Sequence, residues 1–280
     1  MQKTYKKYFA LFVLPTLIAF TLFFIIPFIM GIVLSFCKFT TVNDAKFIGF
    51  ANYAKVFADE TFVHAFWYTA AFTVVSVILI NVLAFAVALL LTKGFKGTNI
   101  FRTVFFMPNL IGGIVLGYIW QLLLNGILMK FSRTLTYSST YGFWGLIILM
   151  CWQQIGYMMI IYIAGIQNIP GELIEAAEID GATKWQILKK VTIPMVMPSI
   201  TVCTFLTLTN SFKLFDQNLA LTNGEPSKMS EMLALNIFNT FYGRTGYEGV
   251  GQAKAVIFFI LVTVIALTQN YLTRRKEVQQ

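Results

Sequence analysis

Charged residues are scarce in this sequence. Asp, Glu, Lys and Arg make up 12% of the 280 residues, whereas 58% are hydrophobic. Soluble domains average about 25% charged and about 45–50% apolar residues. Burying so much apolar surface in one soluble core is implausible, and the same numbers exclude a disordered chain, a coiled coil and a collagen-like fibre. The composition therefore indicates a protein whose solvent is the lipid bilayer.

Cysteine and histidine are also rare, with three cysteines and one histidine. An odd number of cysteines without a CxxC pattern provides neither a disulfide framework nor a zinc site. The phosphate-binding pattern G-x-x-x-x-G-K-[ST] is absent, and KGFKGT at 93–98 does not fit its spacing. No clustered basic stretch points to nucleic acid. We therefore expect no catalytic residue, and no metal ion or cofactor bound by this chain.

The charges that are present divide the chain into six long charge-free runs, at 8–37, 61–92, 103–129, 134–171, 191–212 and 255–273. A membrane-spanning helix needs about 20 mostly apolar residues, and the alternation typical of a membrane β-barrel is absent. We expect an all-α membrane protein with six transmembrane helices in a single domain over residues 1–280. Pro15 and Pro27 predict a kink in the first span. The expected spans are about 9–36, 64–92, 100–125, 141–166, 194–216 and 251–272.

The basic residues are distributed unequally between the loops. With both termini inside, the inner segments hold 12 of the 21 Lys and Arg residues and 5 of the 12 acids, which leaves +7 inside and +2 outside of the total +9. An excess of Lys and Arg marks the cytoplasmic side. We therefore expect a multi-pass membrane protein with both termini in the cytoplasm.

The inner loop at 167–193 has its own helical pattern. Pro170 suits the start of a short helix, the run GELIEAAEI favours helix, and Gly181 is a typical helix stop. ATKWQILKK then predicts a second short helix. On physical grounds this pair of helices either is held by a partner or merely links the fourth and fifth spans.

Several segments resemble a known family. EAAEIDGATKWQILKKVTIPMVMP (175–198) looks like the EAA loop of the membrane subunits of bacterial binding-protein-dependent ABC importers. The segments at 47–57, 101–120, 156–170 and 211–226 look like the carbohydrate-uptake branch, which is similar to the maltose and glycerol-3-phosphate permeases. Together these segments cover most of the chain in the family's order.

The resemblance implies a mechanism and a set of partners. In the family the EAA helix docks on a cytoplasmic ATPase, and closure of two ATPases rocks the spans between inward-open and outward-open states. The expected partners are two ATPase subunits that hold ATP and Mg, a second related permease subunit and an extracellular solute-binding protein. The resemblance also implies that the cargo is a sugar or oligosaccharide and that the chain lies in the bacterial plasma (inner) membrane. The resemblance assigns coupling to the ATPase to Glu175, Ala176, Ala177, Asp180 and Gly181.

Polar residues inside spans tend to face a cavity or a partner helix. The fourth and fifth predicted spans carry neutral hydrogen-bonding groups, which suit the hydroxyls of a sugar and fall where maltose-permease-like subunits contact their substrate. For each of them, hydrogen bonding between helices is an equally good alternative, worth about 0.6 kcal/mol. The candidates for the substrate pathway are Gln154, Tyr157, Thr207, Asn210 and Ser211.

Other polar and small residues have simpler interpretations. We expect Asn81 to be structural and His64 to have no functional role. For Lys213 and Asp216, spaced i, i+3, a mutual ion pair is favoured over contact with substrate. For Gly113 and Gly117, packing within the chain is favoured over a subunit interface.

Three other classes of membrane protein are alternatives to an ABC importer subunit. An ion-coupled secondary transporter commonly carries acids within its spans, and all six charge-free runs lack them. A membrane enzyme would need a catalytic cluster, which the sequence does not contain. A non-transporting membrane scaffold subunit remains open from sequence.

Overall fold

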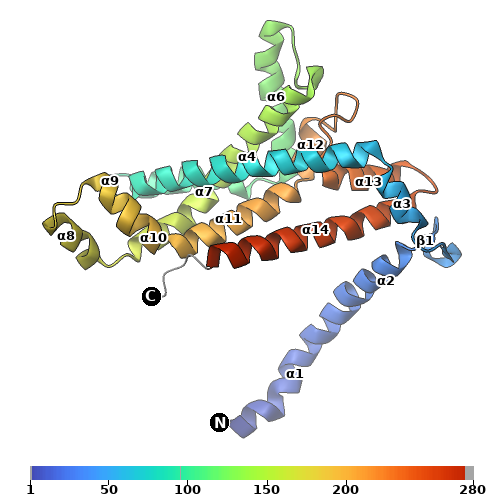
Figure 1. Cartoon of the computed structure of the whole chain (residues 1–280), viewed down its shortest axis with the longest axis horizontal. Helices are drawn as coiled ribbons and strands as arrows, with labels where there is room; N and C mark the ends of the chain where they lie inside the picture. Colours follow the sequence, from blue (N-terminus) through green and yellow to red (C-terminus); the bar gives the residue numbers. More distant parts are fainter. Residues whose placement is uncertain (1, 95, 275–280) are drawn as a thin grey trace. The chain divides into compact units, whose positions relative to one another are not determined.

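The computed structural model describes residues 2–94 and 96–274, and its regular structure is mostly helical (Figure 1). Its internal contacts divide the chain into two compact units. One consists of Met1–Glu60 with Ile237–Ile260, and the other of Thr61–Asn236 with Leu261–Gln280. Helices α13 (Leu233–Gly243) and α14 (Glu248–Arg274) contribute to both units.

The first helical segment of the first unit contains a π-helical turn. Helix α1 (Gln2–Phe20) continues through η1 (Thr21–Ile25) into α2 (Ile26–Leu34). Pro27 has no N–H, and in a regular α-helix its ring would clash with the carbonyl four residues earlier. The π turn widens the helix at this point, and the Ile26 N–H donates to the Thr21 carbonyl five residues back. Where the sequence predicts a kink, the structure has this π turn before Pro27, and Pro15 lies inside the continuous α1.

A short pair of strands and a helix follow α2 in the same unit and are held to its end by hydrogen bonds. Strands β1 (Cys37–Lys38) and β2 (Lys46–Phe47) pair antiparallel around the 3₁₀ turn η2 (Val42–Asp44), and α3 (Ala51–Phe57) comes next. The buried Asn52 side chain donates to the carbonyls of Ser35 and Cys37 at 2.9 and 2.8 Å, which fixes α3 to the end of α2. Hydrogen bonds from the backbone N–H groups of Thr40 and Thr41 hold the pKa of the Asp44 carboxyl below its usual value.

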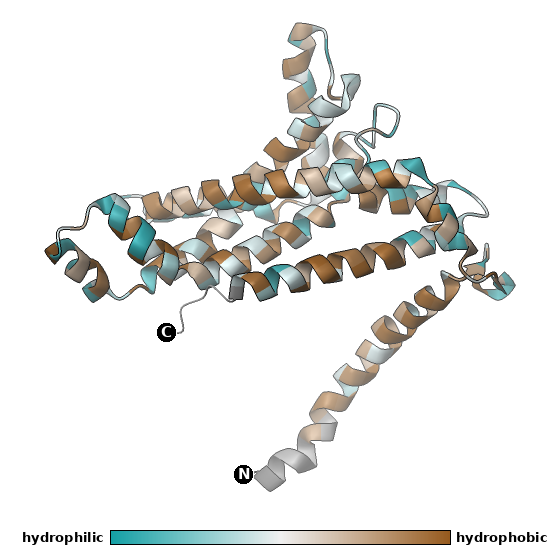
Figure 2. Cartoon of the chain, viewed as in Figure 1, coloured by the Kyte–Doolittle hydropathy of each residue, from teal (hydrophilic) through white to brown (hydrophobic). Residues whose placement is uncertain are grey.

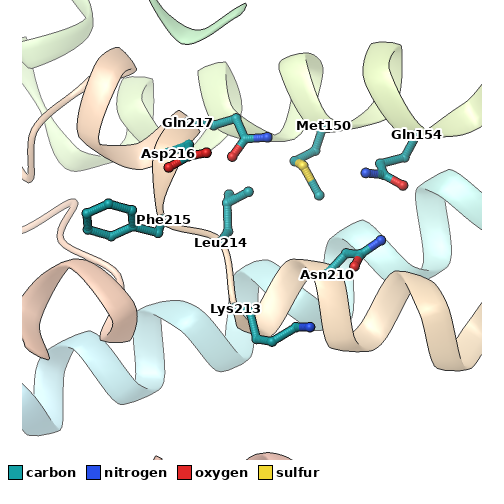
Figure 3. Close-up of a pocket in the computed structure, with 8 residues that line it drawn as sticks. All are labelled: Met150, Gln154, Asn210, Lys213, Leu214, Phe215, Asp216 and Gln217. Carbon is teal, nitrogen blue, oxygen red and sulfur yellow. The ribbon is translucent and has the colours of Figure 1, made fainter. Parts of the chain in front are cut away.

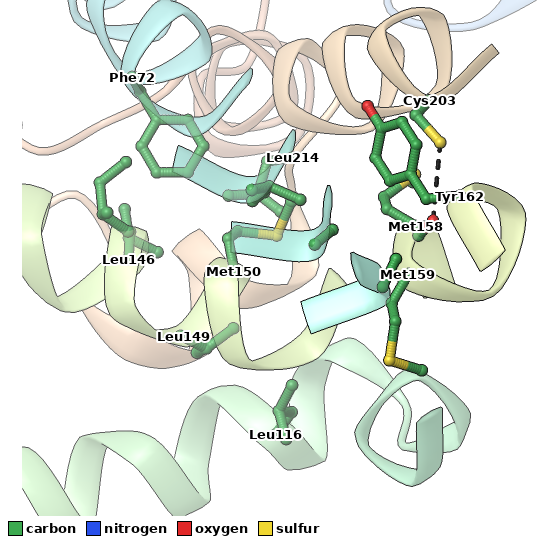
Figure 4. Close-up of a cluster of buried hydrophobic side chains, with 14 of the residues drawn as sticks. Phe72, Leu116, Leu146, Leu149, Met150, Met158, Met159, Tyr162, Cys203 and Leu214 are labelled. Atoms are coloured by element: carbon green, nitrogen blue, oxygen red, sulfur yellow. Dashed lines mark hydrogen bonds between the residues drawn. The ribbon is translucent and has the colours of Figure 1, made fainter. Parts of the chain in front are cut away.

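Three long helices form the core of the second unit: α4 (Glu60–Leu91), α7 (Ser139–Gln167) and α11 (Met197–Phe212). Asn81 of α4 accepts a hydrogen bond from the Tyr162 hydroxyl at 2.7 Å and donates to Thr207 Oγ1 at 3.1 Å. One amide therefore connects all three helices and has the structural role predicted for it. Around this link pack buried apolar side chains, several of which are shown in Figure 4.

The third predicted span, 100–125, is wrong as a continuous helix. The structure has α5 (Thr98–Phe106), a 3₁₀ turn η3 (Met107–Leu110) and then α6 (Gly113–Leu128). Pro108 cannot donate to a helix ladder, and Gly112 is extended with φ −60° and ψ 141°. The chain therefore breaks between the two helices, and in Figure 1 α6 departs from the direction of α4 and α7.

The number of spans agrees with the sequence when one bent pair of helices is taken as a single span. Within residues 2–94 and 96–274, five helices are long and apolar enough to cross a membrane: Phe12–Leu34, Glu60–Leu91, Gly113–Phe131, Ser139–Gln167 and Glu248–Thr273. The pair Lys184–Met195 and Met197–Phe212 meets the same test but is bent by 69°. Figure 2 shows the apolar character of the long helices and the more polar segments at their ends.

Candidate functional site

A cavity of about 390 Å³ lies between α7, the end of α11 and the start of α12 (Asp216–Leu221) in the second unit (Figure 3). Met150 and Gln154 line it from α7, and Asn210 lines it from the last turn of α11. The remaining lining residues are Lys213, Leu214, Phe215, Asp216 and Gln217. The cavity therefore contains two of the predicted pathway residues, Gln154 and Asn210.

Helix α12 is seated against α6 through glycines. A Cβ added at Gly113 would lie 2.7 Å from Asp216 Cβ, and one at Gly117 would lie 2.5 Å from Ala220 Cβ. Only hydrogen at these positions allows the two helices to approach so closely. The predicted packing of Gly113 and Gly117 within the chain is confirmed. This packing holds α12, one wall of the cavity, in place.

A pair of glutamines links that wall to α7. Gln217 Nε2 donates to Gln153 Oε1 at 2.9 Å, and Gln153 Nε2 donates to the Ile111 carbonyl at 3.3 Å. Gln153 thus joins α12 to the break between α5 and α6. The break in the third predicted span therefore helps to position the cavity, because it brings a free carbonyl to α7.

Gln154, unlike Gln153, has a side-chain oxygen without a hydrogen-bond partner. Its side chain is 8% exposed, and its Oε1 is buried without a hydrogen-bond partner. The hydroxyl of Ser211, which does not line the cavity, is also buried and unpartnered. An unsatisfied buried acceptor costs about 1–3 kcal/mol. Since Gln154 lines the cavity, a ligand hydroxyl placed there could satisfy its oxygen.

Lys213 and Asp216 both line the cavity, but the predicted ion pair between them is wrong. The structure describes both residues and records no ion pair between them. The i, i+3 argument requires a helix, and α11 ends at Phe212 while α12 begins at Asp216. The irregular chain between them leaves one cationic and one anionic group at the cavity instead.

Thr207 and Tyr157 lie outside this cavity. Thr207 is fully buried, donates to the Cys203 carbonyl and accepts from Asn81, so it belongs to the link between α4, α7 and α11. Tyr157 is half-buried, and its ring centroid lies 6.4 Å from that of Phe106. The structure thus separates the five predicted pathway residues into two that line a common cavity and three that do not.

The inner loop forms the two short helices that its sequence predicts, α8 (Gly171–Ile179) and α9 (Lys184–Ile187). Gly181 ends α8 with φ +75°, a left-handed conformation that glycine adopts without strain. The N–H groups of Gly181 and Ala182 donate to the carbonyls of Glu178 and Ala177 at 3.0 and 2.9 Å, the two bonds of a Schellman motif.

The surface of this loop is both acidic and apolar. Glu175, Ala176 and Asp180 are exposed, whereas Ala177 is half-buried. Ile179 is 86% exposed and Trp185 is 69% exposed, although both are large apolar side chains. An exposed apolar group flanked by charges is typical of a protein-binding surface.

Three polar residues of the cavity lining, Lys213, Asp216 and Gln217, are not among the predicted pathway residues. Lys213 and Asp216 were assigned to each other, and Gln217 follows the predicted end of the fifth span. The signal that could have found them is the concentration of polar residues directly after that span, in SFKLFDQN at 211–218. In the described ranges 2–94 and 96–274, no group of three or more His, Cys, Asp or Glu side chains is arranged to hold a metal ion.

Comparison with known proteins gives relatives along the full chain. It is 43% identical, over 96% of its length and 94% of the relative's, to the "Probable starch degradation products transport system permease protein AmyD" of Thermoanaerobacterium thermosulfurigenes. It is 29% identical, over 99% of both chains, to the "Multiple sugar-binding transport system permease protein MsmF" of Streptococcus mutans. A crystal structure of a bacterial ABC transporter that imports the acidic polysaccharide alginate contains a similar fold, with a TM-score of 0.82, 23% identity and coverage of 98% of both chains.

The long apolar helices fit a polytopic membrane protein, and the relatives identify a permease subunit of an ABC importer. Residues 80–278 match the family model of the "Binding-protein-dependent transport system inner membrane component". The chain belongs to this family. It is a transport subunit and not an enzyme, and ATP hydrolysis takes place in a separate ATPase subunit. This assignment favours the importer over the ion-coupled carrier and the scaffold subunit.

Proposed function

We propose that the chain forms one half of a translocation pathway for a neutral oligosaccharide and that the cavity around Gln154 contacts the sugar. The observation that carries the proposal is the unsatisfied Gln154 Oε1 in a cavity that also holds the Asn210 amide. Sugar hydroxyls both donate and accept hydrogen bonds, so they match amides on opposite walls.

The relatives suggest the class of sugar. A relative with 43% identity is named for starch degradation products and another for multiple sugars. Starch breakdown yields short α-linked glucose oligomers, which carry no charge. The cargo proposed here is therefore a maltooligosaccharide. Neutral hydrogen-bonding groups suffice for it, and the one cation and one anion of the lining, Lys213 and Asp216, give the cavity no net charge.

Coupling to the ATPase is assigned to α8. Glu175, Ala176 and Asp180 are exposed on a helix whose end is fixed by Gly181. A short, rigidly ended helix can transmit a push from a partner better than a flexible loop can. Glu175, Ala176, Ala177, Asp180 and Gly181 thus form the proposed docking surface for one ATPase subunit, which holds ATP and Mg.

The assembly requires further chains. We propose a second homologous permease subunit for the other half of the pathway, two cytoplasmic ATPase subunits and an extracellular solute-binding protein. We also propose that the chain lies in the bacterial inner membrane with both termini in the cytoplasm, which the excess of Lys and Arg in the inner segments supports.

The decisive experiment measures ATP hydrolysis by the complete complex reconstituted in liposomes. With the solute-binding protein present, maltooligosaccharides should stimulate hydrolysis, whereas amino acids and charged uronic-acid oligomers should not. Stimulation by one of those other solutes alone would reject the proposed substrate class. Uptake by the lone chain without ATP would reject the proposed coupling.

A further inference from the structure

Two adjoining cavities lie in the second unit at the end where α4 finishes, α5 begins and α7 leads to α8. One, of about 440 Å³, has a largely polar lining that includes Thr92, Asn99 and Gln167. The other, of about 350 Å³, has a largely apolar lining that includes Phe106, Ile160 and Ile163. Arg102 and Gln167 line both cavities, so the polar and the apolar cavity adjoin at these two residues.

Arg102 carries an unsatisfied donor at this junction. Its Nε is buried and has no hydrogen-bond partner, and the structure records no ion pair for this guanidinium. A guanidinium binds phosphate through several planar N–H groups. A phosphate oxygen at the junction would satisfy the buried Nε.

The segments that line both cavities carry only positive charge. Residues 61–171 contain no Asp or Glu, so the segment that builds both cavities supplies no carboxylate. Lys93 and Lys96 are exposed in the turn between α4 and α5. The positive φ angles of Gly94 (+73°) and Gly97 (+91°) shape this turn, and no atom lies within 4 Å of a Cβ added at Gly94, so a headgroup can approach the backbone.

We propose that this pair of cavities binds one anionic phospholipid, with its phosphate against Arg102 and the start of an acyl chain along Phe106, Ile160 and Ile163. Basic pockets between spans are suited to the headgroups of anionic lipids. A free phosphate would use only the polar cavity, whereas a lipid uses both. The proposal does not depend on which solute is transported.

The test uses the complete complex in nanodiscs made from equal parts of phosphatidylcholine and phosphatidylglycerol. After release into detergent, native mass spectrometry counts the retained lipids. The wild type should retain phosphatidylglycerol selectively, and Arg102→Gln should lower that selectivity by about tenfold, which corresponds to about 1.4 kcal/mol. Arg133→Gln, a matched change in an exposed arginine of the loop after α6, should leave it unchanged. Equal retention by Arg102→Gln and the wild type would overturn the proposal.

Two further measurements separate the alternatives. If Arg102→Gln fails to assemble, the exposed double variant Lys93→Gln/Lys96→Gln carries the test and should also lower selectivity, and unchanged selectivity there would overturn the proposal. Inorganic phosphate should not raise the melting temperature of the complex in pure phosphatidylcholine, whereas phosphatidylglycerol should. Equal stabilisation by phosphate would overturn the lipid assignment, as would loss of the ATPase subunit from Arg102→Gln with lipid retention unchanged.

Discussion

Lys254 Nζ lies 2.7 Å from Asp59 Oδ2, and the Lys254 side chain is completely buried. The same ammonium donates to Thr240 Oγ1 at 2.8 Å. All three residues belong to the first unit, where they connect α13 and α14 to the short link between α3 and α4. Sequence counting places Lys254 at the edge of the last charge-free run, where it would be taken for a solvated residue. In the fold, Lys254 is instead buried and holds parts of the first unit together through Asp59 and Thr240.

Removal of one partner of this pair should be strongly destabilising. Asp59→Ala leaves a buried ammonium without its counter-ion, and breaking a buried pair in this way costs about 3–5 kcal/mol. We expect a clear fall in the melting temperature of the purified complex in detergent. Lys38→Met, which removes an exposed lysine in β1, is the control and should leave the melting temperature close to that of the wild type. An unchanged melting temperature in Asp59→Ala would show that Thr240 and its surroundings suffice to hold Lys254.

Gln154→Leu should raise stability and lower transport at the same time. The substitution removes a buried acceptor without a partner, which relieves a cost of about 1–3 kcal/mol, but it also removes the group proposed to receive a sugar hydroxyl. We expect a higher melting temperature together with a rise of about tenfold in the substrate concentration needed for half-maximal ATPase stimulation.

Thr207→Val is the comparison for Gln154→Leu. Thr207 is buried and hydrogen-bonded to Asn81, away from the cavity. Loss of this hydrogen bond in Thr207→Val should lower the melting temperature and leave the half-maximal substrate concentration unchanged. If both variants changed that concentration alike, the cavity around Gln154 would not be the place of contact.

Gly117→Ala should change the shape of the cavity, because it displaces α12, which forms one wall. The new methyl group would lie 2.5 Å from Ala220 Cβ, so α12 must move, and overpacking of this kind costs about 1–3 kcal/mol. We expect reduced uptake and a lower melting temperature. Gly126→Ala is the matched control on the same helix, since nothing lies within 4 Å of its added Cβ. It should be neutral or stabilising by up to about 1 kcal/mol, and a similar loss in both variants would reject the role of the contact between α6 and α12.

Glu175→Lys should uncouple the importer without affecting its insertion. The residue is exposed on α8, so the fold tolerates the change, whereas a reversed charge on a docking surface is repulsive. We expect loss of uptake and weaker retention of the ATPase subunit during purification, with normal amounts of the chain in the membrane. Glu225→Lys, an exposed reversal in the loop after α12, should retain both uptake and the ATPase. Normal uptake by Glu175→Lys would exclude α8 as the coupling element.

Gly181 offers a second route to the same surface. Its φ of +75° is left-handed, a conformation that costs about 1–2 kcal/mol for a residue with a side chain. Gly181→Val should therefore loosen the end of α8 and lower coupling, seen as less solute transported per ATP hydrolysed. Because no atom lies within 4 Å of the added Cβ, the effect acts through the backbone and not through a clash. An unchanged ratio would mean that the α8 end need not be rigid.

Most of the long apolar helices and the two helices of the inner loop follow from local sequence. Charge-free length determines where a helix can cross a membrane, because each helix satisfies its own backbone within the segment. The end of α8 is also a local property, because Gly181 adopts the left-handed conformation that ends a helix whatever other helices pack nearby. The family resemblance added the ATPase partner, which no local pattern contains.

Contacts between distant segments could not be read in this way. Pro108 explains the break after Phe106, but the contact made by the Ile111 carbonyl at this break depends on Gln153 in another helix. The separation of Lys213 from Asp216 depends on where α11 ends. The burial of Lys254 against Asp59 and the sharing of Arg102 by two cavities likewise arise from residues far apart in the chain. Helix formation is a local balance, whereas burial, charge pairing and cavity shape depend on which helices pack together, and only the folded chain brings those helices side by side.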